Sequence, residues 1–306
     1  MHFDCQRNGR PDQQYLKYRW KPFACDLPRF SGKDLLERMR NKSITFIGDS
    51  ISLNQWQSLT CMLHSHHPHA AFTQDNHHGF TRFTFLNHNV SVGFSWNPFL
   101  VEKESTSYGS VLHLDSISDF DANIWRHSDV LVFNSWLWWL HTGSDKPWDF
   151  IVDGDNVHRD MDRLVAYEKA LSTWAHWVES NIDFDKTLVF FRGDSPRHPN
   201  ASYWGKNDDG KQCSEEREPI EVREGNEYPL IKKPAGESIV ERILRKMSKP
   251  VRLLDITRLS ELRKDGHPGA YSSVHHQGMD CTHWCVPGVP DTWNHLFYIE
   301  LLRTYL

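Results

Sequence analysis

The sequence predicts an α/β fold with a central parallel β-sheet covered by helices on both faces. Two short runs, Val130–Phe133 and Leu188–Phe191, are apolar at every position, as in strands buried on both faces of a parallel sheet. Expected strands also alternate with expected helices along the chain, which is typical of a sheet sandwiched between helical layers. Ligand sites in such sheets lie beyond the carboxyl ends of the strands, so functional residues are expected there.

The expected elements follow one another from the N-terminus. The first forty residues are irregular and are expected to wrap the domain before a helix at Lys33–Arg40. The polar, turn-rich stretch Pro196–Pro234 predicts a surface excursion that forms one wall of a groove. The other expected elements are strands at Ser43–Ile47, Phe80–Phe85, Val90–Trp96, Asp129–Phe133, Thr187–Phe191 and Val251–Asp255, and helices at Asn54–His64, Arg163–Ser180, Gly236–Met247 and Asp291–Tyr305.

Net charge, hydrophobic content and the length of apolar runs limit the classes of function and partner that the sequence allows. The 306 residues carry a formal net charge of −5, so nothing favours a nucleic-acid partner. A hydrophobic content of 39% suits one α/β domain, alone or with a small appendage. No apolar run approaches membrane-spanning length and no signal peptide follows Met1, so we expect no membrane contact by this segment.

A Gly48-Asp49-Ser50 turn follows the apolar run Ile44–Ile47 and precedes the helix expected at Asn54–His64. Ser50 is therefore expected at a strand-to-helix turn. The unpaired N–H groups of a helix N-terminus can hold a developing oxyanion there. Such a motif is common as a plain turn, so the flanking strand and helix carry the prediction.

An Asp280-Cys281-Thr282-His283 turn lies near the other end of the chain. Asp280 and His283 are three residues apart, so in a helical turn their side chains fall on one face. The carboxylate can accept from one imidazole nitrogen and leave the other directed at a serine. Together with Ser50, the two turns supply a nucleophile, a base and an orienting carboxylate. This is the residue set of a serine acyl-transfer enzyme.

Six segments, spread over nearly the whole chain, carry a family resemblance. They are Arg7–Asp12, Tyr18–Trp20, Cys25–Phe30, Phe46–Ser50, Asn54–Trp56 and Asp280–Asn294. In them the chain resembles the trichome-birefringence-like family, plant Golgi proteins that O-acetylate cell-wall polysaccharides on an SGNH-hydrolase-like fold. The last segment is the longest and the most specific.

The resemblance implies a function and a domain organisation. The function is an O-acetyltransferase that moves acetyl from a donor co-substrate to hydroxyls of xylan or pectin through an acetyl-serine, with no bound cofactor, in the Golgi lumen. Residues 1–42 would be the C-terminal part of an N-terminal wrapping segment, and residues 43–306 an SGNH-like PC-esterase domain, a three-layer sandwich. Family members usually carry a membrane anchor and a stem, so this chain resembles a truncated gene model or a trimmed catalytic portion.

Supporting site residues follow from the same resemblance. Asn134 matches the asparagine that donates its amide to the oxyanion in SGNH-like enzymes, although a turn asparagine that caps a helix is the plainer interpretation. The N–H of Ser50 is the expected second donor. Gly48, Asp49 and Asn54 are expected to support the nucleophile turn, with Asp49 accepting from its backbone.

Exposed tryptophans are candidates for glycan contacts, because sugar C–H faces stack on aromatic rings, although most of the thirteen are expected in the core. Trp136 and Trp138 are the expected contacts. Further candidates are Trp139, Trp148 and Trp204.

A charged run near the C-terminus has two interpretations. The run Arg263–Pro268 resembles a family element, and its Arg263 and His267 would contact an acidic glycan in a groove; as an exposed charged loop it is most simply solvated surface.

No carboxylate or cysteine accompanies the histidines at ligand spacing, so no metal site is expected. A solvated helix C-terminus is expected for His64, His66, His67 and His69.

Six cysteines and three glycosylation sequons, at Asn41, Asn89 and Asn200, favour the oxidising secretory lumen. Disulfides are expected to pin the loop that holds Cys281 and Cys285. A zinc site from these two and His283 is the alternative, which no second Cys-x-x-Cys supports. The spacing around the base and the family pattern predict a bond from Cys213 to Cys281 or Cys285. One or two of the three N-terminal cysteines are expected to be unpaired.

Two other functions stay open. A polysaccharide acetylesterase would use the same triad and differ only in whether water or sugar meets the acyl-enzyme. A wall-glycan binding protein with a vestigial triad is the alternative from another class. The retained Ser50, Asp280 and His283 argue against it.

Overall fold

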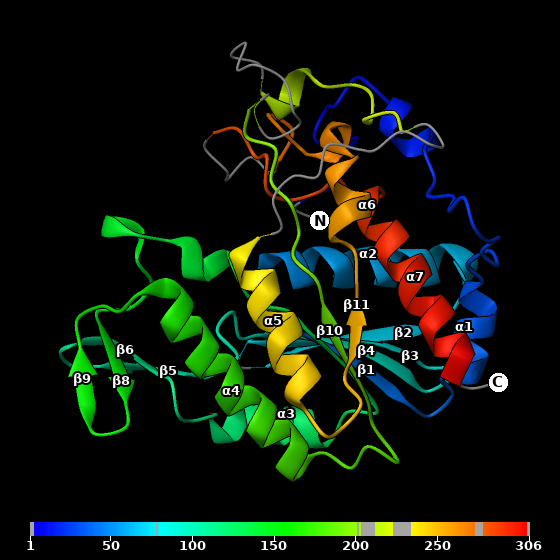
Figure 1. Ribbon diagram of the computed structural model, residues 1–306. Helices are drawn as coiled ribbons and strands as arrows, with labels where there is room; N and C mark the ends of the chain where they lie inside the picture. The colour runs from blue at the N-terminus through cyan, green and yellow to red at the C-terminus, as the bar shows by residue number, and fades with distance from the viewer. Residues whose placement is uncertain are drawn as a thin grey trace.

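The computed structural model describes residues 3–77, 79–200, 202, 212–222, 234–272 and 278–304. Its main sheet has seven strands in the order β11-β10-β7-β1-β4-β3-β2, which confirms the predicted α/β class (Figure 1). Five strands are parallel: β1 (Ser43–Gly48), β4 (Val90–Trp96), β7 (Val130–Phe133), β10 (Leu188–Arg192) and β11 (Arg252–Leu254). Two antiparallel strands complete one edge: β2 (Phe72–His77) and β3 (Phe80–Phe85).

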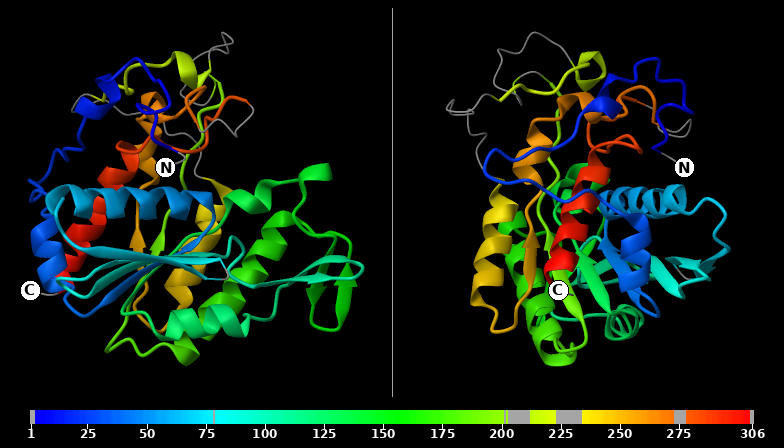
Figure 2. Two further views of the ribbon diagram at one scale, coloured as in Figure 1. Left: turned by 180° about the vertical axis from the view of Figure 1, so that it is seen from behind. Right: turned by 90° about the vertical axis from the view of Figure 1, so that its right-hand side faces the viewer.

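Helices cover both faces of this sheet and make the expected three layers (Figures 1 and 2). One hydrophobic cluster packs the sheet against α1 (Gly32–Arg38), α2 (Ser50–His66) and α7 (Val289–Thr304). A second cluster packs the opposite face against α3 (Asp119–Arg126), α4 (Arg163–Asn181) and α5 (Ala235–Lys246). The apolar central strands are thus buried on both sides, as their sequence indicates.

A smaller sheet was not predicted from the sequence. Its strands, in the order β5-β6-β8-β9, are β5 (Glu102–Thr106), β6 (Gly109–His113), β8 (Phe150–Asp153) and β9 (Asn156–His158). They are short and only partly buried, so the fully apolar runs that mark central strands are missing. Strand β2, which is exposed along its whole length, and the short helices α3 and α6 (Thr257–Glu261) were not predicted either.

The predicted strands are confirmed to within one residue at each end, but α2 begins four residues earlier than expected. The reason is the cap. Asp49 is the N-cap residue, and its Oδ1 accepts the N–H of Ile51 at 2.9 Å. Ser50 is therefore the first residue of the helix itself.

The N-terminal segment wraps over the carboxyl ends of the strands, beside the loop that carries His283 (Figure 2). The N–H of Val286 donates to the carbonyl of Phe3 at 2.8 Å, and Cys5 forms a disulfide with Cys285. No helix in the described ranges is both long and apolar enough to cross a membrane.

The second disulfide joins Cys213 to Cys281, one of the two predicted partners. Both cysteines that flank His283 are thus oxidised, so the zinc alternative has no thiolate ligand. Cys25 is an exposed free thiol and Cys61 takes part in neither disulfide, in line with the expectation for the first three cysteines. Trp204, Ala201 of the third sequon and much of the 196–234 excursion lie outside the described residues.

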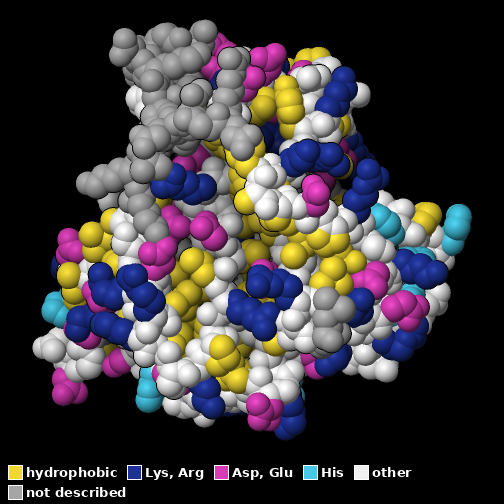
Figure 3. Space-filling model, turned by 45° about the vertical axis from the view of Figure 1, so that its right-hand side comes forward, with side chains coloured by type: hydrophobic (Ala, Val, Ile, Leu, Met, Phe, Trp, Pro, Cys, Tyr) yellow, Lys and Arg dark blue, Asp and Glu magenta, His cyan; other side chains and the backbone are white. Residues whose placement is uncertain are grey.

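Basic and acidic side chains are interspersed over the face shown in Figure 3. This mixed surface agrees with the net charge of −5.

Candidate active site

The nucleophile turn is built on a glycine. Gly48 ends β1 with a φ of +150°, and a Cβ at this position would lie 2.1 Å from Oδ1 of Asn134. Any other side chain would therefore push the end of β7 away from the turn. The close approach brings Ser50, at the N-terminus of α2, next to Asn134.

Ser50, His283 and Asp280 lie in hydrogen-bonding contact although 233 residues separate the first two. Nε2 of His283 is 2.7 Å from Oγ of Ser50, and Nδ1 is 2.9 Å from Oδ2 of Asp280. The carboxylate can only accept, so Nδ1 carries the proton and Nε2 is free to accept the Ser50 proton. This arrangement can make a serine nucleophile.

Asp280 is arranged to stay ionised. Burial by itself raises its pKa, but hydrogen bonds from the His283 side chain and from the N–H groups of His283 and Thr282 outweigh burial and lower the pKa to about 2. The carboxylate therefore remains charged and orients the imidazole. Phe3 of the N-terminal segment stacks on the imidazole ring of His283, with the ring centroids 4.7 Å apart.

Asn54 links the two halves of the site. It lies one turn after Ser50 on α2 and is fully buried. Its Oδ1 accepts the N–H of Trp284 at 2.8 Å, and its Nδ2 donates to the carbonyl of Trp284 at 3.0 Å. The helix that carries Ser50 is thereby fastened to the loop that carries His283.

Asn134 follows β7, and its side chain contacts the turn that leads to Ser50. Its Nδ2 donates to Oδ1 of Asp49 at 3.2 Å, and its Oδ1 accepts from the hydroxyl of Ser52. It caps no helix: the 3-10 turn that follows has Trp136 at its N-cap position and no side-chain cap. The helix-capping interpretation is therefore wrong, and one amide N–H of Asn134 remains for an oxyanion.

A buried ionic group under the turn was missed by the sequence reasoning. Burial lowers the pKa of Arg192, at the end of β10, to about 10, although the charges of Asp49 and Asp194 oppose this shift. Burial raises the pKa of Asp194 to about 7. The signal was present in the sequence: two charged residues, Arg192 and Asp194, directly follow an apolar strand.

The tryptophans divide between core and surface. Trp136, Trp139 and Trp148 are buried, which confirms the core interpretation for them. Trp138 is half-buried and meets Trp96 edge-on, with centroids 5.2 Å apart. Trp96 is 41% exposed and was not predicted as a site residue.

Trp96 and Trp138 line a cavity of about 230 Å³ together with Asn97, Lys103 and Asp121. This cavity adjoins the nucleophile turn, because Trp96 pairs with Gly48 across β1 and β4 and the N–H of Asn97 donates to the carbonyl of Gly48 at 3.0 Å. Trp96 is the last residue of a strand that the sequence predicts, and this position was the signal that could have identified it.

The expectation of an exposed loop at residues 263–268 is wrong. Arg263 pairs with Asp265 and donates to the carbonyl of Tyr15, and His267 is 2% exposed and stacks on Trp284. The N-terminal segment covers this run: Arg10 donates to the carbonyls of Asp265 and His267. His267 is therefore engaged inside the protein, whereas Arg263 is partly buried and lines a cavity of about 130 Å³ with Tyr18 and Trp20.

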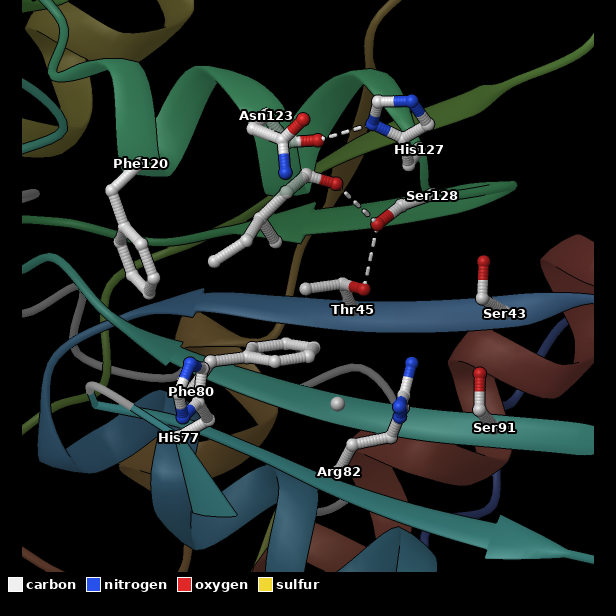
Figure 4. Close-up of a pocket in the computed structure, with 12 residues that line it drawn as sticks. Ser43, Thr45, His77, Phe80, Arg82, Ser91, Phe120, Asn123, His127 and Ser128 are labelled. Carbon is white, nitrogen blue, oxygen red and sulfur yellow. Dashed lines mark hydrogen bonds between the residues drawn. The ribbon is translucent and has the colours of Figure 1, made fainter. Parts of the chain in front are cut away.

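Another cavity, of about 280 Å³, lies between α3 and the sheet (Figure 4). Thr45 and Phe80 line its sheet side, and Phe120 and Asn123 its helix side. No triad residue lines it: Ser43 and Thr45 lie in the amino-terminal half of β1, whereas Ser50 follows the carboxyl end of that strand. Across the described ranges, no group of three His, Cys, Asp or Glu side chains is placed to hold a metal ion.

Comparison with known proteins agrees with this geometry. Residues 27–300 match the PC-esterases, a GDSL/SGNH-like acyl-esterase family found in Pmr5 and Cas1p, and residues 1–26 match the PMR5 N-terminal domain. The chain is 49% identical to the Arabidopsis thaliana protein trichome birefringence-like 43, over 99% of the chain and 81% of that relative. The chain belongs to the trichome-birefringence-like family.

Two more members of the trichome-birefringence-like family support the assignment. Trichome birefringence-like 42 and 39 of Arabidopsis thaliana are each 47% identical, over 98% and 99% of this chain and 81% and 80% of their own lengths. Membership confirms an SGNH-like fold and places the chain among proteins of acyl-ester chemistry.

Proposed function

We propose that this family member transfers an acetyl group to a hydroxyl of a plant cell-wall polysaccharide, xylan or pectin, through an acetyl-Ser50 intermediate. The 2.7 Å contact between Oγ of Ser50 and Nε2 of His283, with Asp280 behind the ring, carries the proposal. Ser50 is fixed by the cap of α2 and His283 by its loop, so the pair is aligned before substrate binds.

The first half-reaction forms the acyl-enzyme. As Oγ of Ser50 attacks the donor's acetyl carbon, its proton moves to Nε2 of His283. The Ser50 N–H and the amide of Asn134 hold the oxyanion. His283 then gives its proton to the leaving group, and the donor's bond to acetyl breaks.

The second half-reaction discharges acetyl to the acceptor. A sugar hydroxyl gives its proton to Nε2 of His283 and attacks the acetyl carbon, and Oγ of Ser50 leaves and takes that proton back. We assign the acceptor ring to the cavity of Trp96 and Trp138, because an exposed tryptophan there adjoins the nucleophile turn and offers an apolar face to sugar C–H groups.

Mass spectrometry distinguishes the proposal from its rivals. Incubation with an acetyl donor alone should add one acetyl mass to the peptide that contains Ser50. A transferase then discharges slowly to water and quickly to the right glycan, because the acceptor site positions the attacking hydroxyl. Discharge at one rate with and without glycan would favour the acetylesterase. Absence of the adduct with every donor would reject the acyl-enzyme and favour a binding protein.

The proposal places the protein in the Golgi lumen. Two disulfides suit an oxidising compartment, and the sequon residues Asn41 and Asn89 are exposed to solvent, as glycosylation requires. Localisation of a tagged full-length protein, with glycosidase sensitivity as the readout, tests it.

A further inference from the structure

The peptide unit that joins His283 to Trp284 is held at both ends. Its N–H, which belongs to Trp284, donates to Oδ1 of Asn54 at 2.8 Å. Its carbonyl, which belongs to His283, lies 2.7 Å from Nδ1 of His267. A carbonyl oxygen only accepts, so Nδ1 of His267 carries the proton of this bond. The backbone beside the base is thus fixed by α2 from one side and by His267 from the other.

His267 is held in turn by a second histidine. Its Nε2 lies 2.7 Å from Nδ1 of His198, and Nε2 of His198 lies 3.0 Å from the carbonyl oxygen of Glu261. Both rings are buried, and His267 stacks on Trp284 with centroids 4.0 Å apart. Three polar contacts therefore connect the Glu261 carbonyl to the His283 carbonyl through two imidazoles.

Proton counting fixes the direction of this chain. Three contacts require three protons, whereas two neutral imidazoles carry two. Burial lowers the pKa of His198 to about 4 and the pKa of His267 well below its usual value, so both rings are neutral near pH 7. The contact that lacks a proton should be the longest, because facing lone pairs repel. We therefore assign the two protons to the two 2.7 Å contacts, since the 3.0 Å contact of His198 with the Glu261 carbonyl is the longest of the three.

We propose that His267 is a positioning residue for the catalytic base, locked by His198 into the form protonated on Nδ1 so that it holds the His283 carbonyl. His198 then donates from its own Nδ1, and both rings share the same tautomer. A partner at one ring nitrogen sets which nitrogen is protonated, and here each ring sets the next. This inference rests on the proposed role of His283 as the base.

Kinetics of substituted enzymes test the role. His267→Phe keeps the ring that packs on Trp284 and removes both nitrogens. With 4-nitrophenyl acetate we expect kcat to fall about ten- to hundredfold with KM unchanged, because the base is displaced while ester binding is untouched. His267→Asn offers an amide N–H to the same carbonyl and should restore part of kcat.

The chain offers a matched control. Nδ1 of His127, the C-cap residue of α3, also lies 2.7 Å from a backbone carbonyl, that of Asn123, but beside the other cavity (Figure 4). His127→Phe should leave kcat and KM at the wild-type values. A His267→Phe enzyme with wild-type kcat would overturn the proposal.

Nitrogen-15 NMR of the histidine side chains reads the tautomer without any activity. We expect His267 to show a protonated Nδ1 and a bare Nε2, with its signals assigned by their loss in His267→Asn. A proton on Nε2 overturns the proposal even if the phenylalanine variant fails to fold. If Ser50→Ala kept full ester hydrolysis, the proposed function would fail instead, and the tautomer of His267 would stand as a separate result.

Discussion

His283 is held through its backbone as well as its ring. Its N–H donates to Asp280, its carbonyl contacts His267, and its two ring nitrogens contact Asp280 and Ser50. Phe3 stacks on the ring. A side chain fixed at so many points loses little freedom when the transition state forms, which is the basis of pre-organised catalysis.

Ser50→Ala should lower ester hydrolysis and glycan acetylation by about a thousandfold or more, because the triad acts as a unit. The hydroxyl is small and contributes little packing, so the melting temperature should stay near that of the wild type. Initial rates and thermal unfolding, measured on the same preparation, check both statements. Substantial turnover by the alanine enzyme would rule out acetyl-Ser50.

Trp96→Ala should raise the KM for the acceptor glycan about tenfold, because one stacking contact with the sugar ring is lost. Hydrolysis of 4-nitrophenyl acetate should be unchanged, because that ester needs no acceptor site. Trp20, 36% exposed in the N-terminal segment, provides the control. Equal effects of Trp96→Ala and Trp20→Ala on acceptor KM would remove the acceptor from this cavity.

Among the elements, α2 contributes twice to the candidate site: its first residue is the proposed nucleophile Ser50, and its next turn carries Asn54, which fastens the loop of His283. Asn54 makes both hydrogen bonds of that fastening with a single side chain. The loop itself is pinned by disulfides at Cys281 and Cys285, on either side of His283. The relative position of nucleophile and base thus depends on contacts between elements far apart in the chain.

Asn54→Ala should lower the free energy of unfolding by about 2–4 kcal/mol, because it leaves the N–H and C=O of Trp284 buried without these partners. It should also reduce kcat, since the loop is released from α2. Urea unfolding and ester kinetics measure the two effects. Asn123→Ala, on the exposed face of α3, is the comparison and should change neither. A stable Asn54→Ala enzyme would show that the disulfides alone hold the loop.

For the whole molecule, burial of ionisable groups links stability to pH. Burial raises the pKa of Asp291, at the start of α7, to about 6, although hydrogen bonds from Ser58 and Gly288 oppose this. The folded protein therefore binds more protons than the unfolded chain between about pH 4 and pH 6. The contribution of Asp291 to stability is full below about pH 4 and is lost as the pH rises through 6.

Asp291→Asn should remove this dependence. The variant should gain up to about 3 kcal/mol relative to wild type at pH 7, the value of a pKa difference near two units, and nothing at pH 3.5. The amide can donate to Ser58 and accept from Gly288, so the local hydrogen bonds persist. Urea unfolding from pH 3.5 to 7.5 measures the difference, with the exposed Asp155→Asn as reference. Parallel curves for wild type and Asp291→Asn would contradict the prediction.

The α/β class and the central strands followed from the sequence, and so did the candidates Ser50, Asp280 and His283, whose side chains the fold brings into contact. Those signals are local: apolar runs mark buried strands, and short motifs mark the turns at their ends. It also indicated the disulfide from Cys213, through a family pattern. Strand β2 could not be predicted, because a strand exposed along its whole length carries no apolar period. The strands of the small sheet are short and only partly apolar.

The contacts between residues far apart in the sequence become visible only in the tertiary structure. Asn54 and His267 lie 230 and 16 residues from the peptide unit they hold, and nothing in their own segments indicates that contact. The run at residues 263–268 looks like solvated surface because charged residues usually are, yet the N-terminal segment buries it. Local sequence encodes the tendency to form an element, whereas the partners of a buried polar group depend on packing between distant segments.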